Sequence, residues 1–162
     1  MIKPEELKTK ASDRKKANKK LFRKLKKVNP SELDRVMASL HRETFEKINC
    51  LDCANCCKSI SPFLIDRDIQ RIAKFLRMKP SEFVSDYMFE DEEGDYVFKK
   101  SPCPFLMDDN YCSIYEVRPR ACREYPHTDR KRFVQILDLT LKNTSICPAV
   151  FEMVEDLHEK FD

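Results

Sequence analysis

Apolar residues recur at helical spacing through the first fifty positions of the chain. A narrow apolar stripe among lysines predicts a basic amphipathic helix near residues 13–28. A broader stripe predicts a second helix over residues 30–48, which leads directly to Cys50. Asn29 suits the cap of this second helix and Pro30 its first position. The two stripes consist of Leu21, Phe22, Leu25 and Val28, and then of Leu33, Val36, Met37, Leu40, Thr44 and Ile48.

The middle of the chain alternates short helices with strand patterns. We expect a helix over residues 66–76, capped by Asp66, and another that begins at Pro80. Residues 96–98 have the composition of a short strand. Residues 105–114 predict a hairpin, because an Asp-Asp-Asn turn separates two apolar runs.

The last part of the chain predicts one strand and one helix. Val134, Ile136, Leu137, Leu139 and Leu141 suggest a strand, and the helix begins at Cys147-Pro148. The expected fold class is therefore α+β: a small, mostly helical domain with a short antiparallel sheet or hairpins.

Length and composition favour one compact domain with an extension. The chain has 162 residues, of which 41% are hydrophobic. We expect a basic N-terminal helix or arm over residues 1–28 and a cysteine-cluster domain over residues 29–162. No apolar run is long enough for a transmembrane helix, and the Lys-rich start lacks the apolar segment of a secretory signal, so we expect a cytoplasmic protein.

The single glycine, Gly94, excludes several nucleotide-binding motifs. Walker loops, dinucleotide fingerprints and glycine-rich methyl-donor loops each need glycines at several fixed positions. Nucleotide chemistry based on these loops is therefore not expected.

The net charge of +3 conceals a strong asymmetry. Residues 1–30 carry twelve Lys or Arg against three acids, +9, whereas the remainder carries nineteen against twenty-five, −6. The basic segment suits an anionic partner such as nucleic acid or an anionic surface. A solvated arm without a partner is the alternative interpretation.

The eight cysteines are the strongest chemical signal. Four lie within eight residues, in a Cys-x-x-Cys-x-x-Cys-Cys pattern. In a reducing compartment this density indicates metal binding or redox chemistry ahead of disulfides. The candidate metal ligands are Cys50, Cys53, Cys56, Cys57, Cys103, Cys112, Cys122 and Cys147.

The spacing fits an iron–sulfur cluster or zinc and does not choose between them, because thiolates bind both. In an extended chain the adjacent Cys56 and Cys57 point to opposite sides, which suggests different metal positions or different roles. Metal bound by these cysteines would hold the two halves of the domain together. Among the histidines, only His127 is a candidate ligand.

Several residues near the later cysteines are candidates for lowering thiolate pKa values or for acid–base chemistry. Arg118 and Arg123 lie close to Cys122 in sequence, and cations there would lower thiolate pKa values. Glu116, Glu124 and Tyr125 are the nearest acid or base groups, but nothing in the sequence brings them together, so no catalytic residue is assigned.

At these residues the chain resembles the YkgJ-like cysteine-cluster family of zinc- or iron-chelating proteins. The resemblance covers about residues 48–150. It rests on the CxxCxxCC run, Cys103-Pro104-Phe105-Leu106, Tyr111-Cys112-Ser113-Ile114-Tyr115, the segment Arg118 to Pro126, and Cys147. It implies metal chelation by these cysteines. Some members, among them flagellin lysine N-methylases, carry this region within a larger iron–sulfur enzyme.

Two functions fit these features of the sequence. The first is a metal-binding protein of the iron–sulfur class that acts in redox chemistry or in modification of a protein side chain, with a protein as substrate. The second is a zinc-stabilised binding module whose basic arm contacts nucleic acid or an acidic partner.

Overall fold

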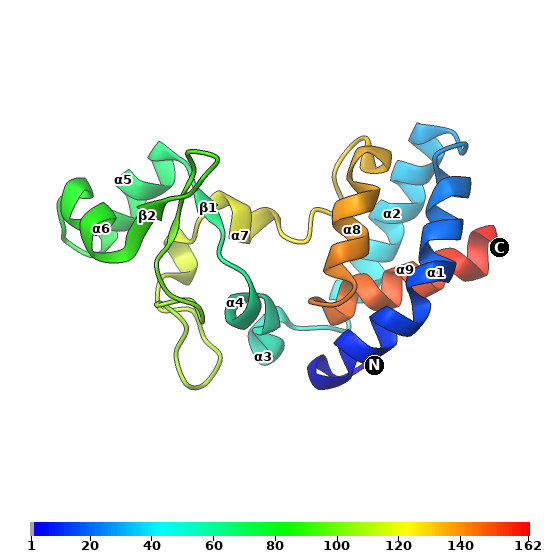
Figure 1. The fold of residues 1–162 in the computed structure, drawn as a ribbon, viewed down its shortest axis with the longest axis horizontal. Coiled ribbons are helices and arrows are strands. Elements are labelled where there is room, and N and C mark those ends of the chain that lie inside the picture. Colours follow the sequence, from blue (N-terminus) through cyan, green and yellow to red (C-terminus); the bar gives the residue numbers. More distant parts are fainter. Residues whose placement is uncertain (1) are drawn as a thin grey trace. The chain divides into compact units, whose positions relative to one another are not determined.

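The computed structural model describes residues 2–162, and these form two compact units (Figure 1). The helical unit comprises residues 2–49 and 126–162. The cysteine unit comprises Cys50–Tyr125. We describe each unit separately.

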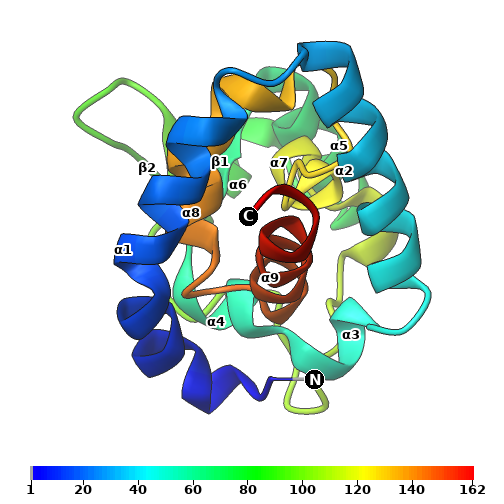
Figure 2. The same ribbon diagram turned by 90° about the vertical axis from the view of Figure 1, so that its right-hand side faces the viewer.

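The helical unit consists of four main helices and two short 3₁₀ segments. Figure 2 shows α9 lying between α1 and α2. In chain order the elements are η1 Pro4–Glu6, α1 Leu7–Leu25, α2 Pro30–Phe45, η3 Phe133–Ile136, α8 Leu137–Asn143 and α9 Pro148–Phe161.

The helical unit has a large apolar core, to which α1 contributes directly, and a smaller cluster of Ile2, Leu7, Ala11 and Phe151. Leu21 and Leu25 of α1 are fully buried, together with Leu33 of α2 and Val150 and Leu157 of α9. Burial of each such leucine stabilises the fold by about 1.5–3 kcal/mol. The predicted basic helix is confirmed, although it begins earlier than expected, and its narrow stripe packs onto the unit.

The start of α2 agrees with the sequence. The Asn29 Oδ1 accepts hydrogen bonds from the backbone N–H groups of Ser31 and Glu32, at 2.9 and 3.3 Å. Pro30 occupies the first turn, where its missing N–H has no partner to lose. The predicted cap is confirmed.

The strand expected over residues 134–141 is wrong, because this segment is helical in η3 and α8. The buried positions are Phe133, Ile136, Leu137 and Thr140, at intervals of three, one and three, whereas Leu139 is 41% exposed. This is helical periodicity. The alternation that suggested a strand included residues that the fold leaves at the surface.

The cysteine unit combines short helices with a three-stranded antiparallel sheet of order β1-β3-β2. Figure 1 shows α5 and α6 side by side next to β2. The mostly helical α+β fold class is therefore confirmed. The elements are α3 Cys50–Cys53, α4 Asn55–Ser59, β1 Phe63–Leu64, α5 Asp66–Phe75, α6 Pro80–Tyr87, β2 Met88–Glu90, β3 Tyr96–Phe98, η2 Tyr115–Val117 and α7 Arg120–Glu124.

The apolar core of the cysteine unit reaches two of the cysteines. Phe83, Phe98 and Phe105 form its aromatic centre, and Cys103 and Cys112 pack against it half-buried. The core therefore fixes the backbone that carries these two thiols.

The segment between Cys103 and Cys112 is a tight turn with a single β-bridge. Leu106 pairs with Cys112, and the N–H of Met107 donates to the carbonyl of Tyr111 at 2.9 Å. Asn110 adopts a left-handed conformation with φ of 67°, which asparagine tolerates well. The predicted hairpin is confirmed in this short form.

The cap of α5 differs from the sequence expectation. Asp66 is the first helical residue rather than the cap, and Ile65 occupies the cap position. The carboxylate of Asp68 accepts from the N–H of Ile65 at 3.2 Å. Two acids two residues apart made the assignment ambiguous from sequence.

None of the helices in residues 2–162 has an apolar stretch of the length required to cross a bilayer.

Candidate metal centre

The CxxCxxCC run folds into two short helical segments, α3 and α4, separated by Ala54. Ala54 has φ of 49° in the left-handed region, so the chain changes direction between the first pair of cysteines and the second. The four thiols are thereby presented from two helical segments instead of one continuous helix.

Cys56 and Cys57 are adjacent in α4 and do not point in opposite directions. Neighbouring residues of an α-helix project about 100° apart. The two side chains share a hydrogen bond, which lowers the pKa of Cys57 to about 7. The extended backbone that we expected here is wrong, whereas separate metal positions for the two thiols remain a prediction.

Cys57 lies where three separate cysteine segments approach one another. Its carbonyl accepts a hydrogen bond from the N–H of Cys103 at 2.8 Å. Burial is the largest cause of the raised pKa of Cys50, Cys103, Cys112 and Cys122, and the charge of Cys57 adds to it. The fold therefore places the segments 50–57, 103–112 and 122 in the same part of the cysteine unit.

The surrounding thiols resist ionisation. Burial is the main cause, and it raises the pKa of Cys103 to about 11 and that of Cys122 to about 12. Burial also raises the pKa of Cys50 and Cys112. Both burial and neighbouring negative charge disfavour a thiolate, so these groups stay protonated unless a cation compensates them.

Arg118 supplies positive charge to this cluster. Its charge lowers the pKa of Cys50, Cys112 and Cys122, against the larger effect of burial. The guanidinium lies 3.9 Å from the ring centroid of Tyr115 and donates to the Tyr115 carbonyl at 2.8 Å. The expected cationic influence is confirmed for Arg118, whereas Arg123 is exposed.

A buried carboxylate holds the backbone on both sides of Arg118. Asp68, only 1% exposed, accepts from the guanidinium of Arg71 at 2.6 Å and from the N–H of Arg120 at 3.0 Å. Arg71 in turn donates to the carbonyls of Val117 and Arg118, at 3.3 and 2.8 Å. We call these contacts the Asp68–Arg71 clamp. It fixes the segment that carries Arg118 and begins α7, the helix of Cys122.

The Asp68–Arg71 clamp has no clear signal in the sequence. An Asp and an Arg three residues apart are common on exposed helices. Only the tertiary structure shows that Asp68 is buried and that its partners include residues 118–120.

A comparison with protein families identifies the chain. The model of the CxxCxxCC family, described as "Putative zinc- or iron-chelating domain", matches residues 49–148. The chain belongs to the CxxCxxCC family. The matched region spans all eight cysteines, and the family description names zinc or iron as the chelated metal. No curated protein matches the chain, and no solved structure does.

The donor chemistry around Cys57 fits the metal of the CxxCxxCC family. Thiolates are ligands of both zinc and iron–sulfur clusters. Ionised Cys50, Cys57, Cys103, Cys112 and Cys122 would carry five negative charges, more than Arg118 and Lys58 balance, and a metal cation compensates such an excess. Within residues 2–162, no three Cys, His, Asp or Glu side chains form a group that could hold a metal ion.

The remaining candidates have different surroundings. Cys53 and Cys56 are half-buried in the cysteine unit. Cys147 and His127 belong to the helical unit, where Cys147 directly precedes α9 and is partly packed against the apolar core. Glu124 pairs with Arg120 at 2.7 Å on the surface of α7. Glu116 is exposed and Tyr125 half-buried, and we assign no catalytic residue among these groups.

Proposed function

We propose that the cysteine unit chelates zinc or iron through thiolates gathered around Cys57. The observation that carries this proposal is the 2.8 Å hydrogen bond from the N–H of Cys103 to the carbonyl of Cys57, which joins the CxxCxxCC run to the segment of Cys103 and Cys112. The charge of Cys57 also adds, after burial, to the raised pKa of Cys50, Cys103, Cys112 and Cys122. Membership of the CxxCxxCC family supports the same chemistry. The proposed ligands in this unit are Cys50, Cys53, Cys56, Cys57, Cys103, Cys112 and Cys122.

Metal binding at these cysteines would stabilise the cysteine unit. Its apolar core draws on α5, α6 and the sheet, whereas α3, α4 and α7 have only four or five residues and bury none of them. The turn between Cys103 and Cys112 is closed by one β-bridge. A bound metal compensates the thiolate charges and joins segments that otherwise repel one another once ionised. Structural metal sites contribute their binding free energy to folding in this way.

An iron–sulfur cluster is the more specific form that we put first. It would act in redox chemistry or in modification of a protein side chain. The family description includes iron, and the Cys103-Pro104 and Cys147-Pro148 pairs are typical of iron–sulfur ligation. When bound, such a cluster supplies electron transfer. The chain supplies the thiolates and, through Arg118, positive charge that favours them.

We also propose Cys147 as a metal ligand. The family match extends to residue 148, and Cys147 is the residue before the first turn of α9. A helix dipole favours a thiolate at this position. Cys147→Ser should reduce the metal content of the purified protein, and an unchanged metal content would remove Cys147 from the ligand set.

Anaerobic purification tests the main proposal. We expect zinc or iron in stoichiometric amount, and, for the iron–sulfur form, acid-labile sulfide with broad visible absorption. Cys57→Ser should strongly reduce the metal content, whereas Ser59→Ala, in the same short helix, should not. Full metal content in Cys57→Ser would contradict the proposed site. Colourless protein with stoichiometric zinc, no iron and no sulfide would reject the iron–sulfur form alone.

The second candidate function is a zinc-stabilised binding module with a basic segment for nucleic acid or an acidic partner. It is supported by the excess of lysine on α1. Deletion of residues 1–28 is an unsuitable test, because Leu21, Phe22 and Leu25 belong to the core of the helical unit. Charge-reversing substitutions of exposed lysines provide a better one, and unchanged salt-sensitive binding in such variants would count against this function.

A further inference from the structure

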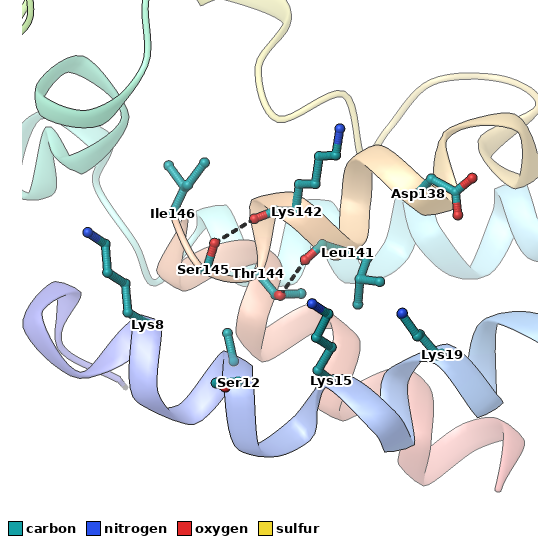
Figure 3. Close-up of a pocket in the computed structure, with 11 residues that line it drawn as sticks. Lys8, Ser12, Lys15, Lys19, Asp138, Leu141, Lys142, Thr144, Ser145 and Ile146 are labelled. Carbon is teal, nitrogen blue, oxygen red and sulfur yellow. Dashed lines mark hydrogen bonds between the residues drawn. The ribbon is translucent and has the colours of Figure 1, made fainter.

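The helical unit contains a pocket between α1 on one side and α8 with residues 144–146 on the other. The lining of this pocket contains no cysteine. The pocket has a volume of about 540 Å³ (Figure 3). Lys8, Lys15 and Lys19 line it from α1, and Lys142 lines it from α8. Asp138 is the only acid of the lining, so the pocket carries an excess of three positive charges.

The four pocket lysines have no carboxylate at ion-pair distance within residues 2–162, in contrast to other cations of α1. Arg14 pairs with Glu155 and Lys24 with Asp162, each at 2.8 Å. These two ion pairs join α1 to α9 and to Asp162, the residue that follows α9. Apart from Asp138 in the lining, no acid of the described residues compensates the charge of the pocket lysines, so most of it is available to a ligand.

The arrangement of these lysines favours a ligand with more than one anionic group. Lys15 lies seven residues after Lys8, and Lys19 four residues later, which corresponds to axial rises of about 10 and 6 Å. Figure 3 shows the three side chains extending from the side of α1 that faces α8. Lys142 belongs to the opposite wall, and Figure 3 shows its side chain extending away from α1. A single carboxylate could not contact all of them.

The other groups of the lining narrow the ligand chemistry. The hydroxyls of Thr144 and Ser145 donate to the carbonyls of Leu141 and Lys142, at 2.7 and 2.8 Å. These two hydroxyl protons are therefore not available to a ligand. The lining contains no arginine and no aromatic ring. Lysine binds phosphate as a point charge, whereas planar carboxylates favour the arginine fork. Nucleobases would find no ring on which to stack.

We propose that this pocket binds a small molecule that carries two or more phosphate groups. Its volume lies in the range of about 300–1,000 Å³ that is usual for small-ligand pockets. Ala11, Leu141 and Ile146 contribute apolar atoms to the lining, and the lysines of α1 contribute its positive charge. The inference does not depend on metal binding, because every lining residue belongs to the helical unit.

Calorimetric titration of the full chain with inorganic tripolyphosphate tests the proposal. The double variant Lys15→Glu, Lys19→Glu should bind the probe about tenfold more weakly or worse, because two attractive charges become repulsive. The control Lys16→Glu, Lys20→Glu changes the same charge on the same helix, one residue away, and neither position lines the pocket. The control should keep at least most of the affinity.

Two results would overturn the proposal. One is the absence of tripolyphosphate binding at low ionic strength. The other is an equal loss of affinity in the pocket and control variants, which would indicate a general polyanion-binding surface. Tighter binding of a single-stranded oligonucleotide than of tripolyphosphate, weakened equally by both double variants, would also indicate such a surface. Circular dichroism and metal analysis of each variant verify that the fold and the cysteine site are unchanged.

Discussion

At the residue scale, Cys57 differs from the cysteines around it. Its pKa is lowered to about 7 by the hydrogen bond with Cys56, whereas burial raises the pKa of Cys103 and Cys122 far above this value. One thiol is thus disposed to ionise near neutral pH, and its neighbours need a cation to do so. This difference within one cluster is an effect of local helical geometry and burial.

Replacement of a remote cysteine should loosen the CxxCxxCC run. In Cys112→Ser or Cys122→Ser the metal would lose a ligand, so we expect lower metal content and faster hydrogen exchange in residues 50–57. Ser113→Ala, next to Cys112, serves as a control that keeps every thiol. Unchanged metal content and unchanged exchange in both cysteine variants would refute the coupling.

Asp162 should make the stability of the helical unit depend on pH under acidic conditions. Hydrogen bonds with His158 and then Lys24 lower its pKa from 3.8 to about 2. Because the folded-state pKa is depressed, this stabilisation is fully present above pH 3.8 and is lost as the pH falls toward about 2.

Thermal unfolding of wild type and Asp162→Asn from pH 6 to pH 2 measures this effect. The wild type should be the more stable protein at pH 6, and the difference should shrink as the pH approaches 2. A difference that stays constant across this range would exclude the contribution of Asp162.

At the scale of elements, the Asp68–Arg71 clamp connects α5 to the segment that presents Arg118 and Cys122. Its acceptor is buried, and its donors come from Arg71 and from the backbone of Arg120. Removal of one partner from a buried charged pair costs more than the pair contributes, because the other charge is left without compensation.

Asp68→Ala should therefore destabilise the cysteine unit by about 3–5 kcal/mol. We also expect weaker metal retention against a competing chelator, since the backbone at residues 117–120 loses its anchor. Asp66→Ala, an exposed acid in the first turn of the same helix, is the matched control and should change stability by less than about 1 kcal/mol. Equal effects of the two substitutions would argue against the clamp.

Helix α1 should contribute to stability through its apolar stripe. Leu25 is fully buried in the core that α1 shares with α2 and α9, so Leu25→Ala should cost about 2–5 kcal/mol in the free energy of unfolding. Lys20→Ala, at an exposed position of the same helix, should have little effect. Denaturant unfolding followed by circular dichroism measures both, and a negligible loss in Leu25→Ala would show that α1 is dispensable for the core.

At the scale of the whole molecule, the two compact units have different sources of stability. The helical unit has a continuous apolar core that includes residues from α1, α2 and α9. The cysteine unit has a smaller core of nine buried residues together with the thiol cluster. A metal should therefore matter most for the cysteine unit.

Removal of the metal with a chelator under reducing conditions should affect the two units differently. Hydrogen exchange is expected to accelerate over Cys50–Tyr125, because the segments around Cys57 lose their common cation. Buried amides of α1, α2 and α9 should keep their protection. Uniform acceleration across both units, or none in the cysteine unit, would contradict this division.

Local features of the sequence were enough to predict metal chelation by thiolates and most of the helices. The CxxCxxCC run, the Cys-Pro pairs and the later cysteines indicated metal chelation, because closely spaced thiolates are ligands of zinc and of iron–sulfur clusters. The cap at Asn29 and the helices that start at Pro30, Pro80 and Pro148 followed from local backbone preferences, which do not depend on distant residues.

The burial of individual side chains and the approach of distant segments are visible only in the tertiary structure. Leu139 and Phe133 are both strongly apolar, but the fold buries only Phe133, and this makes residues 133–143 helical rather than extended. The same holds for Asp68, whose burial has no local signature, and for Cys57, whose neighbours come from segments as distant in sequence as Cys122. Burial and long-range contact arise from the packing of whole elements, so no short stretch of sequence contains them.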